Sequence, residues 1–449
     1  MAGSPRLLPL RFRSVVSSLL PAATAVLLAA PITVRAQDAD ANADLVSIFD
    51  LGGLVADTNG DDVPDAVQAS LVLGVAPSTA ELAAAAEISA RLGFETMAMD
   101  LPIARGQDGV IPIVIGRSGS AASGVTAPGL DPTSLDSGEG AVGVVVVDDR
   151  MWVVVIGGDD DGLLAAARLF AGVLPHTRTL STASLSRVRE DLDAALGAAG
   201  IDDASIRISQ ARARSDRDGI VRLVVDMTAV DPTGAAEALD FLTTIEGEPP
   251  VDEPPVDEPS DAEQADAEQA EDPDAAEESE DDTNPLAYPG LASVEVRIDG
   301  GPVLRLPGRA EPDRPGPISG RPGAGGKDDL DLSSVYTADG LLGGSPIPNS
   351  IDAILVPGSG GISGLPELGG RLGLESTGLV VPLVHPAASI ERPGSRPTMV
   401  LAGTGNRLID QLADSGEIDI DALAPGEGLI QLVPEAFGSK SALVVTGAD

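Results

Sequence analysis

The sequence contains two similar halves in the same order, and this internal repeat limits the possible folds more than any other feature. Residues 91–96 (RLGFET) match residues 371–376 (RLGLES), and Gly138-Glu139-Gly140 matches Gly426-Glu427-Gly428. Other matched segments keep this order: Gly53-Leu54 with Gly340-Leu341, Val63-Pro64-Asp65 with Ile347-Pro348-Asn349, Pro112-Ile113-Val114 with Pro397-Thr398-Met399, and Val154-Val155-Ile156-Gly157 with Val444-Val445-Thr446-Gly447. Chance does not produce such colinearity, so the sequence predicts a duplicated domain.

The first copy shows which elements each module contains. Ser78 and Glu81 form the pattern of a capping box, and apolar residues then recur with helical spacing up to Gly93. Valine-rich runs predict strands covered by helices on at least one face. The expected strands are 66–73, 96–101, 111–115, 141–147 and 151–156, and the expected helices are 78–93 and 162–174. We therefore expect an α/β (α+β) module with one mixed sheet and two helices per copy.

A third unit lies between the copies. Its pattern of helix, two strands, helix and strands predicts a small ferredoxin-like α+β domain over residues 180–306. The modules then cover residues 44–178 and 328–449, and a Pro/Gly-rich linker covers 307–327. The second copy stops before a counterpart of the last helix of the first. We expect either a truncated longer protein or cover from another segment or subunit.

Residues 1–36 have the three parts of a secretory signal peptide. A basic start precedes an apolar stretch over 15–32, and Val34-Arg35-Ala36 supplies small residues at −3 and −1. Two prolines interrupt the apolar stretch, which is short for a membrane span. We therefore expect cleavage after Ala36 rather than an uncleaved anchor, with no later membrane span. The mature protein is expected to be periplasmic or extracellular (secreted).

Charge excludes several function classes. The formal net charge of −42 argues against nucleic-acid binding, which needs a basic surface. The absence of cysteine excludes disulfides, thiol catalysis and cysteine-ligated metal centres. Between Glu246 and Asp282 there are 18 acidic residues and no Lys or Arg, so we expect a disordered insertion over 246–287 in the middle domain. Such a run is usually a solvating spacer; a calcium sponge or partner-binding segment is the other interpretation.

The best local motif for chemistry is the acidic loop from Asp57 to Asp65. It resembles the calcium loops of EF-hands and of thrombospondin type 3 or dockerin-like repeats, in which Ca²⁺ takes six to eight oxygen ligands. The candidate Ca²⁺ ligands are Asp57, Asn59, Asp61, the Val63 carbonyl and Asp65. Asp62 stands where glycine normally makes the turn, and Gln68 stands where a bidentate acid is expected. An acidic turn without an ion is therefore the alternative.

Other polar residues give no catalytic set. The glycines of 358–364 follow a strand but lack the Gly-x-Gly-x-x-Gly spacing, which favours a flexible loop over a nucleotide site. His176 and His385 are not matched between the copies, and Ser118 lacks the Gly-x-Ser-x-Gly elbow. The acids matched between the copies are Glu139 with Glu427 and Glu95 with Glu375. No partner for acid–base catalysis is visible for either pair, so we expect turn and packing roles.

The order of motifs in each copy resembles a known accessory domain. A helix, the strand Pro112-Ile113-Val114-Ile115-Gly116, Gly138-Glu139-Gly140, Val153 to Gly157 and a turn into the helix at Gly162 follow one another. This is similar to the non-catalytic α/β domain that precedes the barrel in family 20 β-hexosaminidases and in α-glucuronidases. The resemblance implies a sheet-based scaffold associated with carbohydrate. Glycosidase activity does not carry over, because no series of eight strand–helix units is present.

Two hypotheses follow for the function. The first is an exported, non-catalytic scaffold or accessory protein of tandem α/β modules, with a carbohydrate or protein partner and Ca²⁺ in the first copy. The second is a secreted hydrolase acting on polysaccharide or peptide, with a site between the copies or in a missing C-terminal region. A cleft lined by Glu139, Glu427, His176 or His385 would favour the hydrolase, and dispersal of these residues would favour the scaffold. The sequence leaves the oligomeric state open.

Overall fold

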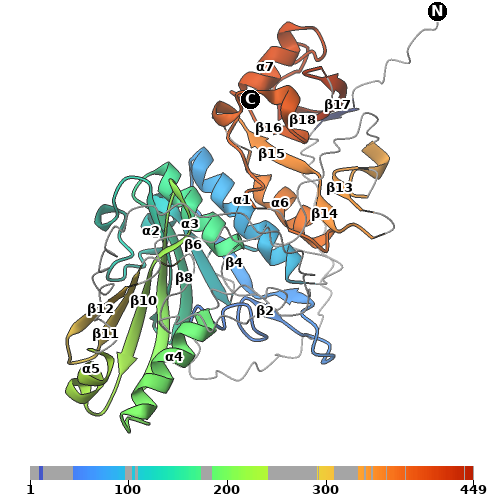
Figure 1. The fold of residues 1–449 in the computed structure, drawn as a ribbon. Coiled ribbons are helices and arrows are strands. Elements are labelled where there is room, and N and C mark those ends of the chain that lie inside the picture. Colours follow the sequence, from blue (N-terminus) through green and yellow to red (C-terminus); the bar gives the residue numbers. More distant parts are fainter. Residues whose placement is uncertain are drawn as a thin grey trace, which may run out of the picture.

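Two β-sheets with helices between them form the described part of the chain (Figure 1). The computed structural model describes residues 10–13, 44–96, 104–106, 110–172, 185–240, 291, 293–307, 332–337, 340–344, 347–360, 362–379, 381–438 and 440–447. The predicted strand at 96–101, the acidic insertion at 246–287 and most of the 307–327 linker lie outside the described residues. None of the described helices is both long and apolar enough to cross a membrane.

The first sheet has nine strands in the order β12-β11-β10-β9-β7-β8-β6-β4-β5. Strands β4, β5, β6 and β8 are parallel, and β7 runs antiparallel to β8 and to β9. The strands of the first module are β4 (Ala69–Val72), β5 (Ala104–Arg105), β6 (Ile111–Ile115), β7 (Glu139–Val147) and β8 (Arg150–Gly157). The predicted strands at 111–115, 141–147 and 151–156 are therefore confirmed.

The second sheet has five strands in the order β1-β17-β18-β16-β15. Strands β15, β16 and β18 are parallel, and β17 is antiparallel to β18. The order β15-β16-β18-β17 thus repeats β4-β6-β8-β7 of the first sheet, with the same directions. The bounds are β1 (Leu10–Arg13), β15 (Ala353–Pro357), β16 (Thr398–Ala402), β17 (Glu427–Ala436) and β18 (Lys440–Gly447). Two small hairpins also correspond: β2 (Val55–Ala56) with β3 (Ala66–Val67), and β13 (Leu342–Gly343) with β14 (Ser350–Ile351).

Helices cover both faces of the second sheet and of the part of the first sheet around β4, β6 and β8. The predicted helix at 78–93 is α1 (Thr79–Phe94), and the Ser78–Glu81 capping box is present. After the equivalent strands β6 and β16 come α2 (Gly116–Ser123) and α7 (Arg407–Asp414), which the sequence did not predict. The other helices are α3 (Asp160–Gly172), α4 (Leu185–Ala198), α5 (Pro232–Asp240) and α6 (Leu365–Leu374). Apolar side chains of α1, α3 and α6 share one large core with the inner faces of both sheets.

The residues between the modules extend the first sheet instead of forming a separate one. Strand β9 (Ser205–Arg214) pairs with β7, and β10 (Arg217–Thr228), β11 (Ser293–Ile298) and β12 (Val303–Pro307) follow. A ferredoxin-like domain has a split βαβ unit, in which another strand separates the two parallel strands. Here β10 and β11 are joined through α5 and pair directly. The elements were predicted correctly, but the separate ferredoxin-like domain was wrong because β7 has an open edge that β9 completes.

Helices α1 and α6 hold the two modules together by close backbone contact (Figure 1). A Cβ atom added to Gly373 would lie 1.9 Å from the carbonyl oxygen of Ala90, and one added to Gly369 would lie 2.5 Å from that of Ala86. A Cβ on Gly93 would lie 2.1 Å from the carbonyl oxygen of Gly370. Small residues at these positions therefore allow the helices to approach more closely than larger side chains would permit.

Candidate functional site

The matched glutamates Glu139 and Glu427 make the same local turn in the two modules. The Glu139 carboxylate accepts the amide of Asp136 at 3.1 Å, and that of Glu427 accepts the amide of Ala424 at 3.0 Å. The preceding residues, Gly138 and Gly426, have φ values of +72° and +76°, which glycine adopts without strain. Each glutamate thus fixes the turn that leads into its strand, as expected from the sequence.

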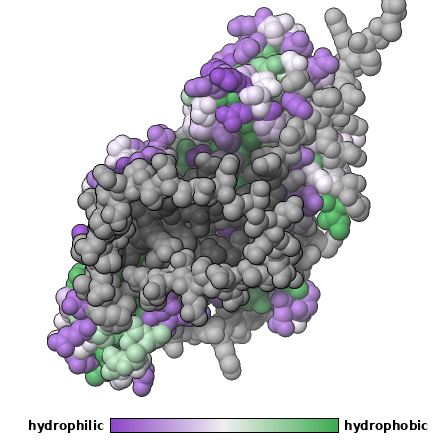
Figure 2. All heavy atoms as spheres, viewed as in Figure 1, coloured by the Kyte–Doolittle hydropathy of each residue, from purple (hydrophilic) through white to green (hydrophobic). Residues whose placement is uncertain are grey.

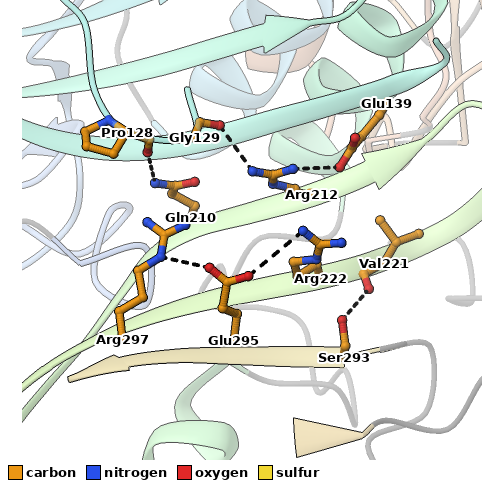
Figure 3. Close-up of polar contacts among 10 residues, drawn as sticks. All are labelled: Pro128, Gly129, Glu139, Gln210, Arg212, Val221, Arg222, Ser293, Glu295 and Arg297. Carbon is orange, nitrogen blue, oxygen red and sulfur yellow. Dashed lines mark hydrogen bonds and ion pairs between the residues drawn. The ribbon is translucent and has the colours of Figure 1, made fainter. Parts of the chain in front are cut away.

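Glu139 also has an ion-pair partner on the neighbouring strand β9. Arg212 of β9 donates to its carboxylate at 2.9 Å, and both side chains are at least nine-tenths buried (Figure 3). Burial opposes ionisation, but the Asp136 amide and the Arg212 guanidinium outweigh it and hold the pKa of Glu139 below its usual range. Glu427 lies on β17, in the other sheet. The two acids are therefore not brought together.

The second matched pair, Glu95 and Glu375, neutralises an arginine one helical turn earlier. Arg91 donates to Glu95 at 2.7 Å, and Arg371 pairs with Glu375 in the same way. The Arg91 guanidinium also lies 4.2 Å from the ring centroid of Phe49, and that of Arg371 lies 5.6 Å from that of Tyr336. Phe49 and Tyr336 each stand four residues before the matched Gly-Leu pair. The matched residues therefore make similar local contacts in the two halves of the chain, although Arg91 is buried and Arg371 is not.

Arg91 is fully buried, and the surrounding groups compensate its charge. Burial lowers its pKa to about 10, and the Glu95 carboxylate opposes that shift. Its Nη1 donates to the carbonyl oxygen of Ala171 at the end of α3, at 2.8 Å. The side chain thus ties α1 to α3 and to the segment carrying Phe49. Its satisfied hydrogen bonds indicate a structural role.

A buried polar cluster joins the modules where α1 meets the second sheet. Glu87 of α1 is fully buried and accepts the amides of Leu383 and Val384 at 3.1 and 2.9 Å. Arg168 of α3 lies 3.9 Å from the same carboxylate and donates to the carbonyl oxygen of Val384 at 3.3 Å. Burial raises the pKa of Glu87 in spite of these partners. The cluster therefore clamps residues 383–384 of the second module to helices of the first.

His385 follows this clamp and has an environment hostile to its charged form. Its amide donates to the carbonyl oxygen of Leu355 on β15, at 2.8 Å. Burial lowers the pKa of its imidazole to about 4, and the nearby Arg168 and Arg396 guanidinium groups add to the shift. The neutral ring is thus favoured at neutral pH. His176, the other histidine of the chain, lies outside the described residues.

The acidic loop 57–65 is exposed and organised by its own side chains. Asp57 accepts the amides of Asn59, Gly60 and Asp62 at 2.6 to 3.0 Å, and the Gly60 amide is the main cause of its lowered pKa. Asp65 accepts the amide of Thr58 at 2.8 Å. Asp62 has a φ of +62°, so it forms the turn in which glycine is usual. Within the described residues, no group of three or more His, Cys, Asp or Glu side chains has a metal-binding arrangement.

A cleft of about 630 Å³ opens at the carboxyl ends of β4, β6 and β8. This edge is where open α/β sheets usually bind ligands. Glycines follow the strands there, and the polar lining comes from the turns that lead into α1, α2 and α3. Those polar side chains are Ser78, Glu81, Arg117, Ser118, Asp159, Asp160 and Asp161.

The main polar groups of this cleft already satisfy one another. The Glu81 carboxylate accepts the Ser78 amide, the Ser118 amide and the Ser118 hydroxyl, each at 2.8 Å. Asp159 accepts the Ser137 hydroxyl and the amides of Gly138 and Gly162, and the Ser137 hydrogen bond is the main cause of its lowered pKa. Asp159, whose carboxylate is bound to three donors, is thus a weak base. Ser118 and Glu81 hold each other in place where α1 and α2 begin.

The first three amides of the glycine-rich segment after β15 are already used by neighbouring backbone. The amides of Gly358, Ser359 and Gly360 donate to carbonyl oxygens of Ala402, Gly405 and Thr404, at 2.8 to 3.1 Å. The carbonyl oxygen of Ser359 accepts the hydroxyl of Thr79, at the start of α1. This segment is thus a contact between the modules, in line with the loop predicted from the sequence.

Figure 2 shows mainly hydrophilic side chains over α7 and the neighbouring part of the second module.

No family model matches this chain, and no curated protein and no solved structure is significantly similar to it.

Proposed function

We propose that the chain is an exported, non-catalytic scaffold or accessory protein built from two copies of one α/β module and associated with carbohydrate. The observation that carries this proposal is the use of the matched polar residues. Glu139 and Glu427 cap equivalent turns, and Glu95 and Glu375 neutralise equivalent arginines. The polar residues that match between the copies thus stabilise turns and helices. This favours a shared structural role for them over a shared catalytic role.

The strand orders support the duplication and the resemblance that it carries. The same order and directions occur in both sheets, and α2 and α7 follow equivalent strands. Buried contacts between α1, α3 and residues 383–384 make the two modules one continuous packed unit. A rigid pair of modules is suited to holding partners at a fixed separation. These features are in keeping with the accessory domains of carbohydrate-active enzymes, to which we compare each copy.

Calcium is proposed as a stabilising ion of the first module only. The ligands would be the side chains of Asp57, Asn59, Asp61 and Asp65 with the carbonyl oxygen of Val63. The positive φ of Asp62 supports this proposal, because it gives the sixth position the turn that such loops need. Bound there, the ion would neutralise carboxylates at the start of the sheet.

The hydrolase alternative with a site between the copies receives no support from the described residues. Glu139 is paired with Arg212 in the first sheet, Glu427 begins β17 of the second, and His385 is beside β15. These three side chains therefore lie at separate positions in the fold and do not line one common cleft. The polar cleft at β4, β6 and β8 is the remaining position for chemistry, and its carboxylates are largely occupied.

The proposed function is tested with the full chain expressed in a secreting host. We expect N-terminal sequencing to find Gln37 first, and retardation of the protein in gels containing polysaccharide. Incubation with polysaccharides and peptides should release neither reducing ends nor amino groups. Release that Glu81→Gln and Ser118→Ala abolish, while Glu427→Gln retains it, would replace the scaffold with a hydrolase in the cleft.

A further inference from the structure

The strands that extend the first sheet have one apolar face and one charged face. On β10, Leu223 and Val225 point into the main core. Of the alternate positions, Arg222 and Asp226 are half-exposed and Val224 between them is buried. The same alternation occurs on β11, whose burial alternates residue by residue. Helices α4 and α5 pack on the apolar side. The charged face is therefore the outer side of β9–β12.

Strand register collects arginines on this outer side. Residues paired across a sheet carry their side chains on the same face. Arg212 pairs with Arg222, Glu295 pairs with Arg305, and Asp226 pairs with both Arg207 and Arg297. We name the five arginines, with the acids Asp226 and Glu295, the arginine face: Arg207, Arg212, Arg222, Arg297 and Arg305.

The arginine face reverses the charge balance of the chain. The whole sequence has 70 acidic and 28 basic side chains, whereas this surface has more arginines than acids. Electrostatic attraction acts over about one Debye length, roughly 8 Å at physiological salt, so local charge decides what this surface attracts. An anionic group is thus attracted here in spite of the net charge of −42.

Ion pairs fix the guanidinium groups and leave much of them accessible. Glu295 accepts Arg297 Nε at 2.8 Å and lies 4.0 Å from Arg222, between the two arginines (Figure 3). The exposed fractions of the side chains are 38 % for Arg222, 29 % for Arg297 and 36 % for Arg207, and Arg305 is exposed. Arg212 is the buried anchor, held by Glu139 and by the carbonyl oxygen of Gly129. The donors are thus held in position before a ligand binds.

The mixture of arginines and acids on this face favours an anionic ligand that carries both carboxylates and hydroxyl groups. Guanidinium groups bind carboxylates through paired hydrogen bonds. Carboxylates such as Asp226 and Glu295 accept hydrogen bonds from hydroxyl groups but repel other carboxylates. A purely acidic peptide brings carboxylates without side-chain hydroxyls, whereas a polymer of uronic acids brings both along a chain. Along a strand of this sheet, residues two apart point to the same face and lie about 6.6 Å apart, so they offer successive contacts to a chain-like ligand.

We propose that the arginine face binds a carboxylate-bearing polysaccharide. The proposal narrows the carbohydrate association of the proposed function and rests on it in that respect. Asp226, the more exposed acid of the face, accepts sugar hydroxyls, and Arg207, Arg222, Arg297 and Arg305 bind the carboxylates. Binding weakens with added salt because the attraction is between exposed charges.

The test measures the affinity of the full chain for polygalacturonate, neutral dextran and polyglutamate at 50 and 300 mM salt. The informative variant is Arg305→Glu, and Arg392→Glu is its control, since Arg392 is also exposed and the net charge changes equally. We expect Arg305→Glu to weaken polygalacturonate binding about tenfold, as loss of a charged hydrogen bond predicts, and Arg392→Glu to change it less than twofold. Arg305→Lys should retain part of the affinity.

Three results would overturn the proposal. Equal affinity of the two charge-reversal variants for polygalacturonate would place binding elsewhere. Tighter binding of polyglutamate than of polygalacturonate would make an acidic peptide, including the segment 246–282 of this chain, the preferred occupant. Binding of dextran alone would refute the anionic ligand and leave the carbohydrate association intact, whereas no binding of either polysaccharide would refute both.

Discussion

Replacement of Gly373 by alanine tests whether α1 and α6 lock the modules together. The new Cβ would lie 1.9 Å from the carbonyl oxygen of Ala90 and 2.8 Å from its carbonyl carbon. Real Cβ atoms do not approach backbone atoms so closely, and no side-chain rotation relieves a clash with backbone. The helices must therefore separate or tilt, which disturbs the core that both sheets share.

Two opposing effects set the size of the change in the free energy of unfolding. Overpacking of a core costs about 1–3 kcal/mol, and a clash between backbones belongs at the upper end. Alanine in place of glycine within a helix returns up to about 1 kcal/mol. The steric cost is the larger, so we expect Gly373→Ala to lose about 2 kcal/mol.

Urea denaturation followed by far-ultraviolet circular dichroism measures this loss. The matched control is Gly197→Ala in α4, where the nearest atom to a new Cβ is 4.0 Å away. With only the propensity effect acting, the control should gain about 0.5–1 kcal/mol. The two substitutions should thus change stability in opposite directions. A gain for Gly373→Ala similar to that of the control would show that the helices do not pack as closely as described.

Three further predictions concern titration, a buried ion pair and calcium. The unfolded chain binds a proton at His385 near pH 6.5 but the folded chain only near pH 4, so stability should fall by at most about 3 kcal/mol from pH 6.5 to 4. Urea midpoints should show this fall reduced in His385→Asn; an unchanged slope would contradict it. Glu139→Ala should cost about 3 kcal/mol because it strands a buried guanidinium. A melting temperature of Glu139→Ala equal to that of the wild type would contradict this. Calorimetric titration of Ca²⁺ should give heat with the wild type and none with Asp57→Ala or Asp61→Ala; no heat from the wild type would exclude the ion.

Local signals in the sequence predicted the elements that local interactions stabilise. The α1 start was evident because Ser78 and Glu81 cap it reciprocally. The β7–β8 hairpin was evident because Asp148 and Asp149 favour the turn between valine-rich runs, and both have positive φ values. Helix α2 escaped prediction because its glycines and serines are poor helix formers. Its Ser118 amide is instead held by Glu81, a residue from a different helix.

Distance along the chain also decided which site contacts were predictable. Arg91 and Glu95 are four residues apart, which is the spacing of an ion pair within a helix. The partner of Glu95 could therefore be recognised from the sequence alone. The Glu139–Arg212 pair depends on β9 joining β7, which no local pattern announces. Because β9 pairs with β7, strands β9–β12 belong to the first sheet, and the arginine face lies on that sheet. Local patterns thus predicted the α/β content, whereas pairing at strand edges joined the elements into two sheets.

The equivalent strands β7 and β17 lead to one last prediction. The outer edge of β7 is completed by β9, whereas that of β17 is paired with residues 10–13. Those residues belong to the predicted signal peptide, so cleavage after Ala36 would remove β1 and expose the hydrogen-bonding groups of β17. An open strand edge readily pairs with another strand. Amides of β17 that pair with β1, near Gly428 and Ile430, should therefore exchange hydrogen faster in the chain that begins at Gln37 than in the full chain. Amides of β16, which lies inside the sheet, are the control and should not change. Equal protection of β17 in both forms would mean that another segment replaces β1 after cleavage.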